Sequence, residues 1–257
     1  MLLLNEEQTM LRDSARSFLA DNAPVAQLRQ LRDSRDPAGF AGNIWSAFCD
    51  LGYAGVLVPE AHGGAGLGAV EMGVLMEQIG RHLSALPFLA SGVVAARLLQ
   101  AAGSEAQQAQ WLPRIARGEA IATLALDEGP KHRPEAVALR AERSGDGWRL
   151  SGSKSFVPDG HVASLLLVVA RSADGPVLFA VPRDTPGVQV ERTVTVDAHN
   201  AARVLLLDVR LPDAARLPAG GQGALQQALD FGRAAAAAEL LGIADDHFCA
   251  GNRKVRR

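Results

Sequence analysis

The sequence lacks the features that mark several large classes of protein. Only two cysteines, Cys49 and Cys249, are present in 257 residues, too few and too far apart for a disulfide framework or a thiolate metal site. No basic segment followed by a long apolar core marks a signal peptide near residues 1–8. The apolar stretch around residues 234–244 is alanine-rich and broken by Glu239, well short of the about 20 residues that span a bilayer. We therefore expect a cytoplasmic protein with no membrane span.

A surplus of positive charge is also absent. The 26 Lys and Arg residues against 28 Asp and Glu residues leave a net charge of -2, so nothing attracts a phosphate backbone by counterion release. No nucleic-acid partner is expected. The 6 histidines show no metal-ligand spacing, so we also expect no metal. What remains is a composition with 48% hydrophobic and 21% charged residues, typical of a folded globular chain.

Apolar residues recur at helical spacing through the first 120 residues or so. Asn5 and Gln8 have the spacing of a capping box, and Ser104 and Gln107 repeat it. Helices are expected to begin at these two sites. Further helices are expected at residues 40–51, 70–79 and 88–101.

The apolar period changes near Ile121, where alternating residues replace helical spacing. Residues 137–142 and 148–150 flank a Ser-Gly-Asp-Gly turn at 144–147, which predicts a β-hairpin. Further strands are expected at residues 165–170, 177–181, 188–190 and 204–211. A helix is expected again at residues 223–247. The fold class is therefore α+β, with an amino-terminal helical domain at 1–120, a small β-barrel or sandwich domain at 121–220, and a helical segment at 221–257.

Several short motifs stand in the order found in one enzyme family. They are VPEAHGGAG at residues 58–66, GSEAQQAQWLPRIARGE at 103–119, GSKSFVPDG at 152–160 and DVRLP at 208–212. This set resembles the acyl-CoA dehydrogenase family, across about residues 1–245. The resemblance implies that residues 221–257 are the start of a carboxy-terminal helical bundle.

The resemblance also implies a function. Such enzymes use FAD to dehydrogenate an acyl-CoA thioester between its α and β carbons. They pass electrons to electron-transfer flavoprotein or a similar acceptor, and a homo- or hetero-oligomer is expected. The flavin would rest on two segments, where the family has ALTE and WIT. The cofactor-binding candidates are therefore Ala125, Leu126, Asp127, Phe156, Val157 and Pro158.

Both segments depart from the family pattern. Asp127 stands where a threonine would hydrogen-bond the flavin, and Pro158 removes another donor. The family's substrate-binding GSD falls on residues 132–134, which read His-Arg-Pro. The match ends near residue 248, before the family's catalytic glutamate, so no catalytic residue is assigned.

Three functional hypotheses follow. The leading one is an acyl-CoA dehydrogenase-like flavoprotein that is incomplete or partner-dependent as this chain. The alternative is a non-catalytic subunit or scaffold that pairs with a complete acyl-CoA dehydrogenase. A third is an unrelated helical and β binding protein.

Residue type supplies expectations for two residues of the GSKSFVPDG motif. Lys154 is expected on a solvated face and Phe156 in the core. Because the resemblance implies a helical bundle of which only the first helix is expected here, Leu225, Leu229, Leu240 and Leu241 are expected to lack cover from sister helices.

Overall fold

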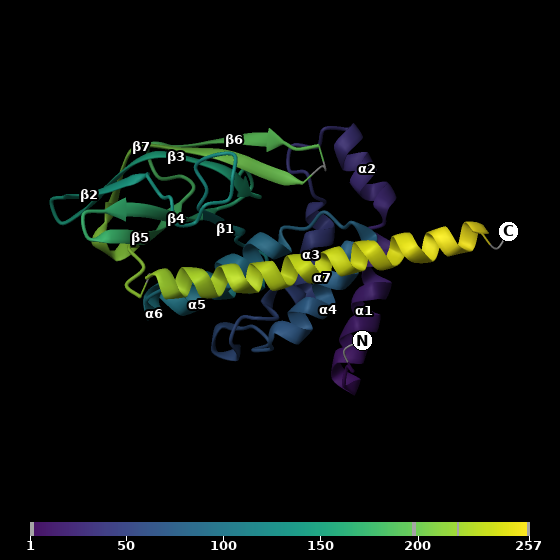
Figure 1. Cartoon of the computed structure of the whole chain (residues 1–257). Helices are drawn as coiled ribbons and strands as arrows, with labels where there is room; N and C mark the ends of the chain where they lie inside the picture. Colours follow the sequence, from purple (N-terminus) through teal and green to yellow (C-terminus); the bar gives the residue numbers. More distant parts are fainter. Residues whose placement is uncertain (1–2, 197–198, 220, 256–257) are drawn as a thin grey trace.

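The amino-terminal half of the chain is helical (Figure 1). The computed structural model describes residues 3–196, 199–219 and 221–255. The helices of this half are α1 (Glu6–Asn22), α2 (Val25–Asp33), α3 (Gly42–Asp50), α4 (Ala69–His82), the π-helix η3 (Phe88–Ala95), α5 (Ala96–Ala102) and α6 (Glu105–Ala116). Short 3-10 turns lie at η1 (Tyr53–Gly55) and η2 (Glu60–His62).

Local sequence signals predicted the helix starts well. Both capping boxes are present: Asn5 pairs with Gln8 before α1, and Ser104 pairs with Gln107 before α6. Helix α2 was not predicted: it is only nine residues long and none of its residues is fully buried, although Val25, Leu28 and Leu31 form a short half-buried apolar stripe. The helix expected from residue 40 begins at Gly42.

Strands occupy the next part of the chain. They are β1 (Ala122–Ala125), β2 (Arg140–Ser144), β3 (Gly147–Pro158), β4 (Leu165–Ser172), β5 (Gly175–Pro182), β6 (Val188–Val194) and β7 (Asn200–Pro212). Their order in one seven-stranded sheet is β1-β4-β2-β3-β7-β6, with β5 beside β4. The described strands therefore form a single sheet, which curls in Figure 1.

The predicted hairpin is confirmed, with Ser144 opposite Gly147, but its first strand starts later than expected. Residues 137–139 lie outside β2. The amides of Ala138 and Leu139 donate to the Glu128 carboxylate, at 2.8 and 2.9 Å, instead of to a neighbouring strand. The Glu128 side chain thus takes the place of a strand for these two amides, whereas the Leu139 carbonyl oxygen accepts from the Arg171 amide of β4 at 2.7 Å.

Strand β4 is covered on both faces. Leu166, Val168 and Ala170 pack into the core of the sheet itself. Leu165, Leu167 and Val169 pack into a second core shared with α5 and α6. This explains why β4 reads as a continuous apolar run and does not alternate.

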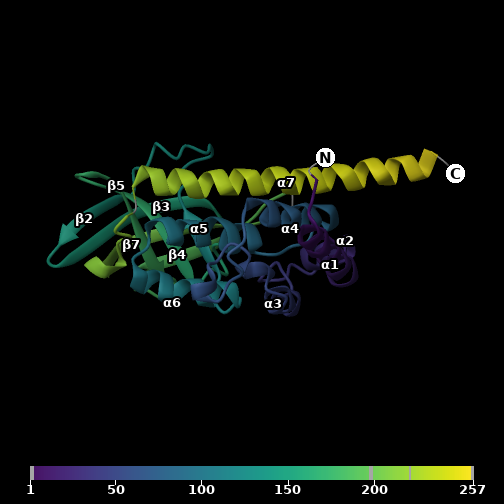
Figure 2. The ribbon, with the colours of Figure 1, turned by 90° about the horizontal axis from the view of Figure 1, so that it is seen from below.

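Helix α7 (Gln222–Val255) follows the short turn η4 (Asp213–Ala215) and runs back along the helical half. Figure 2 shows it lying across α5 and α4 as one long rod. Leu225 is buried and Leu229 packs against the same core, so the expectation that both lack cover is wrong. Leu240 and Leu241 remain 65% and 59% exposed, as expected. Among the described helices, none has the length and apolar character needed to cross a membrane.

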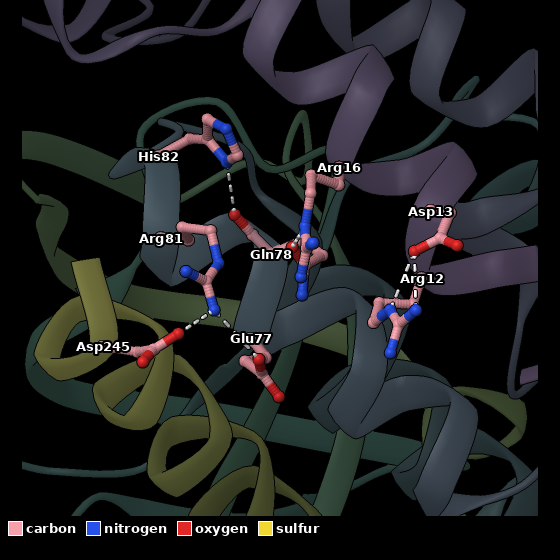
Figure 3. Close-up of polar contacts among 8 residues, drawn as sticks. All are labelled: Arg12, Asp13, Arg16, Glu77, Gln78, Arg81, His82 and Asp245. Carbon is pink, nitrogen blue, oxygen red and sulfur yellow. Dashed lines mark hydrogen bonds and ion pairs between the residues drawn. The ribbon is translucent and has the colours of Figure 1, made fainter. Parts of the chain in front are cut away.

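Two glycines let α7 and α4 approach closely. A Cβ on Gly80 would lie 2.0 Å from the Glu239 carbonyl oxygen, and a Cβ on Gly242 would lie 1.9 Å from the Glu77 carbonyl oxygen. Beside this crossing, the Arg81 guanidinium pairs with the carboxylates of Glu77 and Asp245 (Figure 3). The crossing is therefore fixed by backbone contact and by charge.

Candidate functional site

The end of β3 carries a bulge that turns Phe156 outward. The pairing of β3 with β7 shifts register between Lys154 and Val157. Phe156 has a φ of 51°, a left-handed conformation that is strained for a bulky side chain. Phe156 is 53% exposed. The expectation that Phe156 lies in the core is therefore wrong, because the bulge reverses its direction.

Lys154 is fully buried, so the expectation of a solvated face is also wrong. Its ammonium donates to the Leu126 carbonyl oxygen at 2.9 Å and to Glu128 Oε1 at 2.7 Å. Burial lowers the pKa of Lys154, and the Glu128 carboxylate opposes that shift. Burial alone would raise the pKa of Glu128, but Lys154 and two backbone amides hold it below its ordinary value.

The two segments predicted to hold a flavin lie side by side. The Ser155 amide donates to the Asp127 carbonyl oxygen at 2.7 Å. The Thr123 hydroxyl donates to the Pro158 carbonyl oxygen at 2.6 Å. With the Lys154 contacts, these bonds tie residues 123–128 to residues 154–158.

The six cofactor candidates differ in exposure. Ala125, Leu126 and Val157 are buried, whereas Phe156 and Pro158 are exposed. Only these last two candidates line the cavity described below. The assignment of all six to a cofactor stays a prediction.

Asp127 directs its carboxylate to its own loop. Oδ2 lies 2.9 Å from His132 Nδ1, and Oδ1 accepts from the Arg133 amide at 3.0 Å. Asp127 does not line the cavity. A negative charge at this position therefore does not have to face a bound ring.

A cavity of about 340 Å³ opens beside the bulge. Its inner wall includes Met76, Ile79 and Phe88, which are all buried. Phe156 and Pro158 are exposed and border its mouth. The wall from η3 is a π-helix, an irregularity often found at functional sites. The arrangement suits an apolar chain inside and a flat group at the mouth.

Asp159, directly after β3, lines the same cavity. It also has a left-handed φ of 50°. Burial raises its pKa to about 7, although His199 and a hydrogen bond from Asn200 favour the charged form. Asp159 is therefore a group that exchanges a proton near neutral pH.

This raised pKa predicts how stability depends on pH. Because the folded state holds the Asp159 proton more tightly, the stability gained from it is complete below pH 3.8 and is lost as the pH rises to about 7. Between pH 5 and pH 7, wild type should lose about 2 kcal/mol of unfolding free energy relative to Asp159→Asn. Urea unfolding of both chains at the two pH values measures this. Equal changes in the two chains would contradict it.

Sequence reasoning missed two carboxyl groups of this site. Asp159 follows the predicted flavin segment directly, so its position in the GSKSFVPDG motif was an available signal. Glu239, from α7, also lines the cavity. It is the one acid in the alanine-rich stretch at 234–244, and that isolation was a signal too.

Among the described residues, no group of three or more His, Cys, Asp and Glu side chains is arranged to hold a metal ion. Cys49 is buried, and burial raises its thiol pKa to about 12. The side chain of Cys249 lies outside the described residues.

Comparison with known proteins gives matches over most of the chain. The model of the acyl-CoA dehydrogenase N-terminal domain matches residues 5–119, and that of the acyl-CoA dehydrogenase middle domain matches residues 129–209. The acyl-CoA dehydrogenase FadE12 of Mycobacterium tuberculosis is 30% identical over 219 residues, which are 81% of this chain and 55% of that protein.

Solved structures also match most of this chain. A variant of the Tcur3481-Tcur3483 steroid ACAD is 37% identical with a TM-score of 0.84, covering 94% of this chain and 64% of that one. A glutaryl-CoA dehydrogenase from Mycobacterium smegmatis in complex with FADH2 is 28% identical with a TM-score of 0.87, covering 95% of this chain and 64% of that one. The chain thus spans between 55% and 64% of the length of these relatives.

Proposed function

Because this chain belongs to the acyl-CoA dehydrogenase family, we propose that it is the amino-terminal and middle part of an FAD-dependent oxidoreductase acting on acyl-CoA thioesters. Bound FAD would supply the hydride acceptor for α,β-dehydrogenation. The observation that carries the proposal is the strained, exposed Phe156 at the mouth of the cavity. Strain at an exposed aromatic residue is typical of a binding surface.

The residues at the bulge fit a flat aromatic group. The Phe156 ring offers a face for stacking. The buried Lys154–Glu128 pair ties the segment that carries Phe156 to residues 123–128. Asp127 holds its carboxylate against His132 and the Arg133 amide, so that charge does not oppose a ring that becomes anionic on reduction. These residues would therefore position and cover the ring.

The inner cavity would hold the acyl chain. Met76, Ile79 and Phe88 provide apolar walls that exclude water. An acyl chain inside and a flavin at the mouth would place the reacting carbons beside Phe156 and Pro158. We propose the acyl-CoA thioester as substrate on this basis.

Activity would require an assembly larger than the described chain. The exposed Leu240 and Leu241 on α7 favour a homo- or hetero-oligomer, because apolar side chains gain from cover. Electron-transfer flavoprotein or a similar protein would be the acceptor. The scarcity of cysteine supports a cytoplasmic location.

A second candidate function is a non-catalytic subunit paired with a complete acyl-CoA dehydrogenase. Pro158 favours it, because proline offers no N–H to a flavin. The Tcur3481-Tcur3483 relative is named for two components, which is compatible with such pairing. Flavin absorbance near 450 nm, measured on the chain alone and with a complete homologue, separates the two functions.

Truncating the exposed ring should weaken flavin binding. We expect Phe156→Ala to raise the Kd for FAD about tenfold, because the stacking face is lost, and Phe156→Trp to keep wild-type affinity. Quenching of flavin fluorescence by the full chain measures both. The matched control is Leu207→Ala, since Leu207 is also 53% exposed but does not line the cavity. Equal Kd values for the two alanine variants would argue against a flavin at Phe156.

A further inference from the structure

One wall of the cavity comes from a helix that is weakly attached to the rest of the fold. Leu28 of α2 lines the cavity. It is only half-buried, as are Val25 and Leu31 on the same face of the helix. In the part of the chain that the structure describes, no hydrogen bond or ion pair joins α2 to another helix or strand. Apolar contact along one face is therefore what holds α2 in place.

The other walls belong to packed elements. Met76 and Ile79 of α4 and Phe88 of η3 are buried in the core of the helical half. On the opposite side, Pro158 of β3 pairs with Ala201 of β7 in the sheet. Moving any of these walls would open the core or break the sheet, whereas α2 can move as a unit.

Both ends of α2 are attached to residues that line the cavity. Before the helix, the Ala23 carbonyl oxygen accepts from the Ser84 hydroxyl at 3.2 Å. After the helix, the Gly39 carbonyl oxygen accepts from Asn200 Nδ2 at 3.1 Å. The segment between these two bonds is thus fixed at each end, and its middle carries Leu28 to the cavity.

The residues that flank α2 are suited to act as hinges. Arg35, two residues after the helix, has a φ of 53°, in the left-handed region that is strained for a residue with a Cβ. At the other end stands Pro24, and no side chain caps the helix. Hinges are a few residues at the ends of elements that absorb changes in φ and ψ. A change of backbone conformation at Arg35 would release its strain and move α2.

We propose that α2 is a movable wall of the cavity, which opens at Arg35 to admit an apolar group and closes over that group with Leu28. The closed wall covers the occupant and excludes water from it. An apolar occupant therefore shifts α2 toward the closed state, because Leu28 contacts it only there. The inference goes beyond the proposed function, since it concerns entry to the cavity by any apolar group.

The test is stopped-flow binding of N-phenyl-1-naphthylamine, a neutral apolar fluorophore, to the full chain at pH 7. We expect the observed rate to level off as the probe concentration rises, because opening of α2 becomes the slow step. Leu28→Ala should raise the plateau rate about tenfold, since the closed wall loses its apolar contact. Arg35→Gly should lower it about fivefold, because glycine adopts the left-handed conformation without strain and so stabilises the closed wall.

Matched controls show whether the changes belong to α2. Leu205→Ala removes another half-buried leucine, and Asp208→Gly replaces another residue with a left-handed φ, of 54°. Neither residue lines the cavity, so both controls should keep the wild-type plateau rate. A rate that rises in proportion to probe concentration without levelling off overturns the inference, as do α2 variants that behave like their controls. Failure of the probe to bind overturns it too. These measurements use neither flavin nor acyl-CoA, so a negative result leaves the proposed function standing.

Discussion

Replacing Lys154 with methionine is expected to lower the free energy of unfolding by about 3–5 kcal/mol, because the Glu128 carboxylate then loses its counter-charge in a largely buried site. Lys154 is fully buried and Glu128 is 17% exposed. The Leu126 carbonyl oxygen loses its donor as well. Urea unfolding of the full chain at pH 7 measures the change.

Two further variants isolate the cause. The double variant Lys154→Met with Glu128→Gln should recover part of the loss, because glutamine is uncharged and still accepts from Ala138 and Leu139. Arg117→Met, which breaks an exposed pair with Glu119, should change stability by less than about 0.5 kcal/mol. A loss no larger in Lys154→Met than in Arg117→Met would refute the prediction.

Gly242→Ala should destabilise the chain by about 2–3 kcal/mol. The new Cβ would meet the Glu77 carbonyl oxygen at 1.9 Å and the Arg81 amide nitrogen at 2.8 Å. Both atoms are backbone, so α4 and α7 would have to separate, and overpacking of this kind outweighs the gain in helix propensity from alanine. Thermal and urea unfolding of the full chain measure it.

Gly73→Ala provides a control of opposite sign. Gly73 also lies on α4 facing α7, but a Cβ there would meet only Ala238 Cβ, at 3.9 Å. The alanine should therefore stabilise the chain by up to about 1 kcal/mol through helix propensity alone. Similar stabilities for the two variants would show that the α4–α7 crossing is not as close as described.

Sequence rules that depend on neighbouring residues correctly predicted two helix starts and one turn. The capping boxes at Asn5 and Ser104 and the Ser144–Gly147 turn each depend on residues within about four positions of one another, and all are present. The continuous apolar run of β4 likewise predicted a strand. Helix α2 was not predicted from the sequence; it is short and none of its residues is fully buried.

The directions of the side chains at the candidate site could not be predicted from neighbouring residues in the sequence. Lys154 and Phe156 are two residues apart, so a regular strand would place both on one face. The bulge between Lys154 and Val157 separates them, one inward and one outward. The bulge depends on pairing with β7, about fifty residues later. Asp159 and Glu239 line one cavity because α7 runs back along the helical half of the chain. No local sequence pattern predicts that course.

The return of α7 also sets the order in which the protein can be completed during synthesis. The contacts between α4 and α7 join residues such as Glu77 and Gly242, and the core of α5 and α6 includes Leu225 and Ala228. At 5–20 residues per second, a ribosome needs on the order of 10 s to pass from α5 to the middle of α7. Throughout that interval the apolar surface that α7 later covers stays exposed to solvent. Chaperone demand should therefore peak before α7 emerges, and mutations at the α4–α7 crossing should prolong it.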